Sequence, residues 1–190
     1  SWGRWRKKYR FRLHVRIQVP SEYDVDFHTG AGNVDIADVR GDIDGRTGAG
    51  NISLGRIDGR VDVTSGSGNV DVAGAVGSLR AQTGAGNITL EDVSGEVRAM
   101  TGAGNVVAHI SSQPDEDSRL ESGAGNVTAY VERTVGLTID AHASVGSATC
   151  DYDLRIRGKW MSKSFSGAIN GGGPDLTMRS GVGNVSLRRM

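Results

Sequence analysis

One stretch of the sequence combines the side chains that recognise anionic or sugar ligands. Residues 155–165 bring arginine, lysine, tryptophan and phenylalanine into a short span, and guanidinium and indole groups together suit such ligands. The candidate contact residues are Arg155, Arg157, Lys159, Trp160, Lys163 and Phe165. The alternative is a cap in which Trp160 and Phe165 pack onto the core, and both interpretations stay open.

The remaining candidates for catalysis or metal binding are weaker. The four histidines are scattered along the chain, with no pair at ligand spacing. The Gly-Ala-Gly phrases are not followed by a helix, as a dinucleotide-binding loop requires. The acidic run at residues 115–117 could hold calcium, but a solvated loop is the simpler interpretation. We therefore predict no enzymatic activity, no cofactor and no metal site.

Charge is balanced overall, with 22 basic and 22 acidic residues, so no nucleic-acid partner is predicted. The N-terminal arm, residues 1–10, is strongly basic, and its tryptophans give it the character of a membrane-flanking segment. A solvated tail is the alternative. As a candidate self-association arm we list Trp2, Arg4, Trp5, Arg6, Lys7 and Lys8. The single cysteine, Cys150, excludes an intramolecular disulfide.

A repeated phrase, Thr-Gly-Ala-Gly-Asn-Val, determines what must position these side chains. It begins at residues 29, 47, 65, 83 and 101 and returns at 122 and 180 in variant form. A period of 18 residues predicts a solenoid, because one unit is too small to bury its own apolar side chains. Its frequent glycines disfavour helices. We predict an all-β, right-handed parallel β-helix (β-solenoid) of about eight or nine coils.

The fifth position of the phrase is asparagine throughout. We expect these side chains to form a structural ladder inside a corner, and the glycines at positions 2 and 4 to take positive φ angles, which asparagine also tolerates. The predicted ladder comprises Asn33, Asn51, Asn69, Asn87, Asn105, Asn126 and Asn184.

Outward positions carry mixed charge. Position 16 of the repeat reads Asp44, Asp62, Arg80, Arg98, which allows one ion pair between neighbouring coils. Such exposed pairs contribute about 0–1 kcal/mol each, so this column is expected mainly to keep the face soluble.

The predicted domain is a single solenoid over residues 11–190. Strict alternation of apolar and polar residues over 11–19 predicts a strand, and residues 11–28 are expected to form an N-terminal strand cap. Regular coils follow over 29–121, and irregular coils over 122–190, with an excursion at 155–165. The last coil has no segment after it, so we expect its edge to be uncovered.

These features resemble the bacterial putative-adhesin β-solenoid family, related to GIN-type head domains. The resemblance rests on the strand ending in Val19-Pro20, on the serial Gly-Ala-Gly-Asn phrases and on the closing segment from Ile169 to Asn184. It implies a non-enzymatic domain of the bacterial cell envelope, exported or membrane-tethered.

We therefore expect a structural or adhesion module at an extracytoplasmic location, with self-assembly end to end into filaments as one form of its action. The expected partners are other copies of the chain and envelope or surface glycans, with membrane proximity through a segment before the arm. The alternatives are a monomeric adhesin that binds glycans or an envelope polymer, and a polysaccharide-active enzyme.

Overall fold

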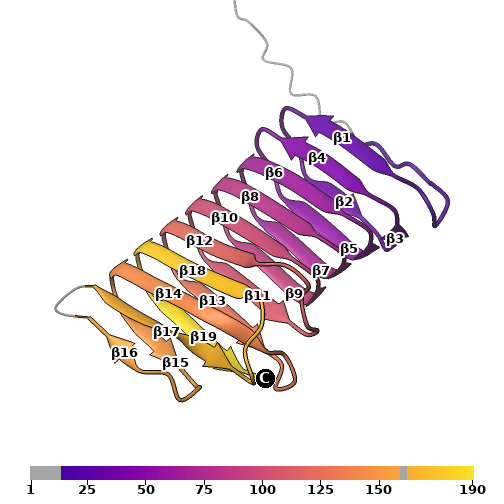
Figure 1. The fold of residues 1–190 in the computed structure, drawn as a ribbon. Coiled ribbons are helices and arrows are strands. Elements are labelled where there is room, and N and C mark those ends of the chain that lie inside the picture. Colours follow the sequence, from indigo (N-terminus) through magenta and orange to yellow (C-terminus); the bar gives the residue numbers. More distant parts are fainter. Residues whose placement is uncertain (1–13, 159–161) are drawn as a thin grey trace, which may run out of the picture.

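The fold is a stack of short, mostly parallel β-strands in two layers, without a helix in the part of the chain described (Figure 1). The computed structural model describes residues 14–158 and 162–190. About six turns follow one another in chain order, with roughly 18 residues per coil. An all-β solenoid with this coil length is therefore confirmed, while its right-handedness stays a prediction.

The two layers are a ten-stranded and a nine-stranded sheet. In spatial order, the ten-stranded sheet contains β1 (Val25–Thr29), β4 (Ile43–Thr47), β6 (Val61–Ser67), β8 (Leu79–Ala85), β10 (Val97–Ala103), β12 (Ser118–Ala124), β18 (Asp175–Val182), β14 (Leu137–Val145), β17 (Lys163–Ile169) and β16 (Ile156–Arg157). The nine-stranded sheet contains β15 (Ala148–Cys150), β19 (Val185–Arg189), β13 (Val127–Val131), β11 (Val106–Ile110), β9 (Ile88–Ser94), β7 (Val70–Val76), β5 (Ile52–Asp58) and β2 (Val34–Ile36), with β3 (Val39–Arg40) also paired to β5.

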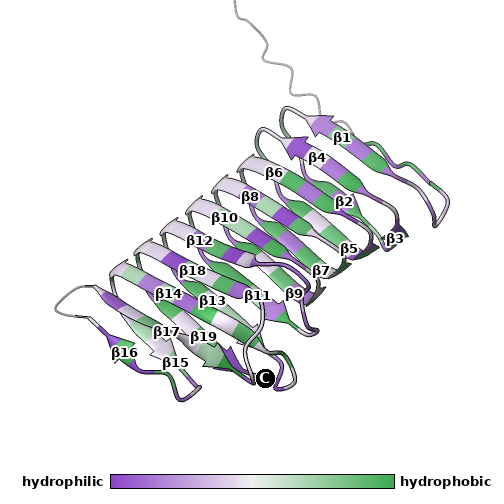
Figure 2. Cartoon of the chain, viewed as in Figure 1, coloured by the Kyte–Doolittle hydropathy of each residue, from purple (hydrophilic) through white to green (hydrophobic). Residues whose placement is uncertain are grey.

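The core lies between the sheets and follows from the alternation of residues along each strand. Figure 2 shows apolar and polar residues alternating within individual strands. One inward column of aliphatic side chains, fully buried from coil to coil, is formed by Ile52, Val70, Ile88 and Val106. Because strands in register place equivalent residues side by side, each coil buries its apolar side chains against its neighbours.

The glycines of the corner phrase serve two different purposes. Position 4 takes a positive φ, for example 147° at Gly68, as expected. Position 2 does not, and its glycine is needed for space, since a Cβ at Gly66 would lie 2.4 Å from the carbonyl oxygen of Gly48. The expectation of positive φ at position 2 was therefore wrong. Asn170 is the single described non-glycine residue with positive φ, so the ladder asparagines do not use that conformation either.

The C-terminal coils are not stacked in chain order. After β13 the chain continues in β14 and β15, returns through the antiparallel strands β16 and β17, and then inserts β18 between β12 and β14. Likewise, β19 pairs with both β13 and β15. The expectation of an uncovered last coil was therefore wrong, because this coil is enclosed on both sides. The expected eight or nine consecutive coils are also corrected to about six, because the later strands fold back.

The predicted strand at residues 11–19 is not present over the described residues 14–19. Val15 and Ile17 are 64% and 76% exposed, respectively. The chain joins the stack only after Pro20, where Tyr23 N–H donates to Arg40 O at 2.9 Å. The first coil instead closes the core with Phe27 of β1, whose ring occupies the space where a side chain at Gly45 would lie.

Candidate functional site

The outer face of the ten-stranded sheet carries a regularly spaced column of six charged residues, one on each of six successive strands. The column, called the charge column below, reads Asp26, Asp44, Asp62, Arg80, Arg98 and Arg119, on β1, β4, β6, β8, β10 and β12. Each residue is in register with the next. With strands about 4.8 Å apart, the column spans about 24 Å and changes sign once, at its centre.

The arginines of the charge column are oriented along their own strands. Arg98 binds Glu96 at 2.5 Å and Arg119 binds Glu121 at 2.6 Å, and both arginine side chains remain about half exposed. The hydrogen bond and the charge of Glu121 raise the pKa of Arg119, which stays cationic. Asp62 binds Arg60 at 3.3 Å rather than Arg80. The cross-coil ion pair between Asp62 and Arg80 is absent from the ion pairs of the described residues.

A groove of about 580 Å³ lies beside the charge column, where the sheet meets the Gly-Ala-Gly corner. Neighbouring coils approach closely at this corner, so the groove is lined there by glycines, such as Gly84 and Gly102, where a side chain would not fit. Its outer wall carries an amide, a thioether and two charged groups. The lining residues along the sheet are Thr64, Gln82, Met100, Glu121 and Arg179. A smaller hollow of about 160 Å³ lies at the centre of the charge column, between Asp62 and Arg98.

The corner itself is held by two columns of hydrogen bonds. The side-chain oxygen of Asn69 accepts from the backbone N–H of Asn87 at 2.9 Å, and the same bond recurs from Asn33 through to Asn184. Most of these asparagines are exposed, so they lie outside the corner rather than inside it as expected. Inside the corner, Thr83 Oγ1 donates to Gly68 O at 2.8 Å. These groups are engaged in holding the coils together.

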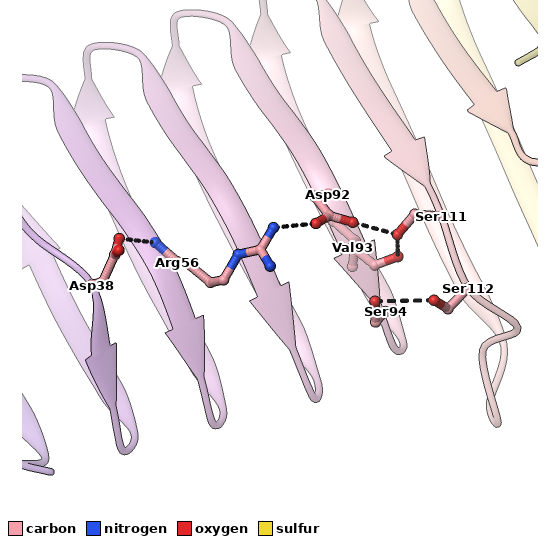
Figure 3. Close-up of polar contacts among 7 residues, drawn as sticks. All are labelled: Asp38, Arg56, Asp92, Val93, Ser94, Ser111 and Ser112. Atoms are coloured by element: carbon pink, nitrogen blue, oxygen red, sulfur yellow. Dashed lines mark hydrogen bonds and ion pairs between the residues drawn. The ribbon is translucent and has the colours of Figure 1, made fainter. Parts of the chain in front are cut away.

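The outer side of the nine-stranded sheet carries a second polar network (Figure 3). Arg56 binds Asp92, two coils away, and Asp92 also accepts a hydrogen bond from Ser111 Oγ at 2.5 Å. Asp38 accepts from the backbone N–H of Arg56 at 2.7 Å. Nearby, the rings of His109 and Tyr130 stack with their centroids 4.5 Å apart. These groups pair with one another along the stack.

The structure buries one of the candidate contact residues predicted in the stretch 155–165 and exposes others. Phe165 is only 1% exposed and belongs to the core, so it cannot contact a ligand directly. Its described residues extend the ten-stranded sheet, with β16 antiparallel to β17 and β17 antiparallel to β14. Arg155 and Arg157 are exposed, and Lys163 is half-buried. Lys159 and Trp160 lie outside the described residues, as does the whole basic arm over residues 1–10.

Within residues 14–158 and 162–190, no three His, Cys, Asp or Glu side chains come together as a metal site would require. In the acidic loop, Asp117 accepts a hydrogen bond from the backbone N–H of Asp175 at 2.8 Å, which secures the inserted strand β18. The same two ranges contain no helix that is long and apolar enough to span a membrane.

The sequence identified only the middle of the charge column. In the sequence, Asp26 falls within the expected cap and Arg119 follows a break in the 18-residue period, so the period alone does not place them with the other four. Counting back 18 residues from Asp44 gives Asp26, so the sequence did contain a signal for this residue. Arg119 could be aligned only once the longer connection between β11 and β12 was known.

Comparisons with known proteins show the family but no activity. No curated protein matches the chain. Among solved structures, it is similar to the crystal structure of a putative cell adhesion protein from Clostridium sporogenes, at 12% identity and a TM-score of 0.40, covering 89% of this chain and 92% of that chain. The model of the Toastrack DUF4097 family matches residues 8–188. Since this range is nearly the entire chain, the protein belongs to the Toastrack DUF4097 family.

Proposed function

We propose that this protein is a non-enzymatic structural or adhesion module of the bacterial cell envelope or surface. The observation that carries the proposal is the charge column, which displays six ionic groups at regular spacing along a stack held by many interstrand hydrogen bonds. Such an array suits contact with another extended surface. The extracytoplasmic location rests on the sequence resemblance, as does the kinship with GIN-type head domains.

The second candidate is an adhesin that binds an anionic glycan or envelope polymer. It is favoured by one half of the charge column, where Arg80, Arg98 and Arg119 lie on successive strands. Repeating cations about 4.8 Å apart can follow the charges of an extended polyanion. The arginines remain exposed enough for this, despite their partners on the same strand.

End-to-end assembly into filaments is also part of the proposal. In the fold, the strands that would make the contacts differ from the last coil of the chain, which the sequence suggested. The last strands in the chain are enclosed, so the ends of the stack are β1 and β2 on one side and β15 and β16 on the other. Short strands such as β16 and β15 limit the edge available for pairing with another chain.

The test is an adhesion assay on beads coated with the chain, at low salt. Three target surfaces are offered: the same chain, polygalacturonate as a polyanion, and dextran as a neutral glycan, each with release of reducing sugar measured in parallel. We expect adhesion to the chain or to polygalacturonate, without sugar release. Failure to adhere to any surface, or release of sugar, would overturn the proposal.

A further inference from the structure

We propose that the outer face of the ten-stranded sheet binds the same face of a second copy of this chain. The two copies would be related by a two-fold axis that lies in the interface, runs along the strands and passes between β6 and β8. This inference rests on the proposed function and specifies its partner: contact would be homophilic.

The argument begins with the order of charges in the charge column. Three acids are followed by three arginines on six successive strands, all in register. The rotation reverses the order of the strands and leaves the column facing itself. Every acid then meets an arginine of the other copy: Asp62 faces Arg80, Asp44 faces Arg98, and Asp26 faces Arg119. A self-complementary patch of this kind is what a closed two-fold dimer requires.

The neighbouring outward column is compatible with the same rotation. In register with one another it carries His28, Arg46, Thr64, Gln82, Met100 and Glu121. Across the axis, His28 meets Glu121, Arg46 meets Met100, and Thr64 meets Gln82. No like charges are opposed, and the central pair can exchange hydrogen bonds.

Acidic residues at the border of the face are already engaged within their own chain. Asp42 accepts from the backbone N–H of Arg60 at 2.9 Å, and Glu96 is turned onto Arg98 at 2.5 Å. Asp24 similarly accepts from Asp42 N–H at 2.8 Å. The rotation also places Asp42 opposite Glu96 and Asp24 opposite Asp117. Of these four, Glu96 is paired with a cation, so the border lowers the affinity that the charge column provides.

A second copy fits this face better than an extended polyanion does. A polyanion that follows the whole column would gain three arginines and meet three aspartates, whereas a rotated copy matches all six charges. Charges of both signs in the column fix the orientation of the second copy. A face-to-face arrangement with the strands of both copies in the same order is disfavoured, because it would place like charges against each other.

The size of the face sets the expected affinity. Six strands about 4.8 Å apart, five to seven residues long, give a face on the order of 600 Å² per copy. The total of about 1,200 Å² is at the lower end for specific complexes. Its contacts are mainly exposed ion pairs, which are weak and screened by salt. The dimer should therefore be transient in solution and effective where many copies are displayed together.

Two single charge reversals at the centre of the column test the pairing. Arg80→Asp makes residue 80 repel Asp62 of the other copy, and Asp62→Arg makes residue 62 repel Arg80. Each variant alone should dimerise at least tenfold more weakly than the unchanged chain in sedimentation equilibrium at low salt. Mixed together, they should form a heterodimer, because every central pair is then of opposite charge.

Matched controls carry the same charge changes on the nine-stranded sheet: Arg40→Asp on β3 and Asp35→Arg on β2, both exposed. These controls should dimerise like the unchanged chain, and circular dichroism would check that all variants fold. An unchanged chain that stays monomeric up to millimolar concentration, or a mixture that gains no heterodimer, would overturn the inference. If the monomeric chain still coats beads that bind polygalacturonate, the proposed function stands and only the homophilic partner is wrong.

Discussion

The guanidinium group of Arg56 binds the carboxylate of Asp92 by passing over Gly74, the residue in register with Arg56 on the intervening strand (Figure 3). A Cβ at position 74 would lie 3.3 Å from Arg56 Nε, so the absence of a side chain leaves the path open. The pair links β5 to β9 on the outer side of the nine-stranded sheet. It shows how a long side chain can connect coils that share no backbone hydrogen bonds.

We expect this ion pair to contribute little to the free energy of unfolding. The Arg56 and Asp92 side chains are 61% and 39% exposed, and exposed pairs contribute about 0–1 kcal/mol. A double-mutant cycle with Arg56→Ala and Asp92→Ala, measured by urea unfolding, should give a coupling in that range. A coupling above about 2 kcal/mol would show that the network is a main determinant of stability.

Two glycines at the same position of the repeat should respond differently to alanine. In Gly66→Ala the new methyl would lie 2.4 Å from Gly48 O, and we expect a loss of about 1–3 kcal/mol in unfolding free energy. Gly30, in the first coil, has no atom within 4 Å of the added Cβ, so Gly30→Ala should change stability by less than about 0.5 kcal/mol. Equal effects at both sites would contradict the stacked coils.

The asparagine column should depend on its side-chain oxygens. Asn69→Ala removes the acceptor for the backbone N–H of Asn87, and we expect a loss of about 1 kcal/mol, because water reaches this exposed site. Asn69→Asp keeps an acceptor oxygen and should retain most of the stability. Thermal unfolding of the unchanged chain and the two variants measures these stabilities. A larger loss of stability in Asn69→Asp than in Asn69→Ala would contradict the role of the side-chain oxygen as the acceptor.

Cys150 should react as a thiol with a raised pKa. Burial is the main cause, and it is opposed by the N–H of Tyr152, 3.4 Å from Sγ. The alkylation rate of the native chain should therefore reach its half-maximum at a higher pH than that of the chain in denaturant. Because the folded pKa exceeds the unfolded one, the favourable contribution of the neutral thiol is fully present below the unfolded pKa and is lost as pH rises. Identical midpoints would contradict this.

The strict period allowed the coils to be predicted from residues such as Ile52 and Val70, since stacking in register is the way that so small a unit buries its apolar side chains. The alternation of apolar and polar residues wrongly predicted a strand at Val15 and Ile17. Such alternation indicates which side chains could share one face of a strand, but not whether a neighbouring strand is available for pairing. Phe27 already closes the core there.

The order of the last strands could not be predicted from the sequence. The segment that begins at Asp175 has the same turn phrase as any other coil, and nothing local specifies that it inserts between β12 and β14. That choice depends on tertiary pairing. For the same reason the candidate site was recognised only in part, because Arg119 joins the charge column through the register of β10 with β12.

Distances between spin labels on paired copies test the central claim most directly. Labels are placed in a Cys150→Ser background at Ser67→Cys, near the proposed axis, or at Ala31→Cys in the first coil, both on the exposed corner. The two-fold arrangement predicts about 11 Å between the two Ser67 positions and about 26 Å between the two Ala31 positions at low salt, from strand and sheet spacings of about 4.8 and 10 Å. Ala31 labels closer together than Ser67 labels, or no intermolecular coupling at either site, would contradict the account.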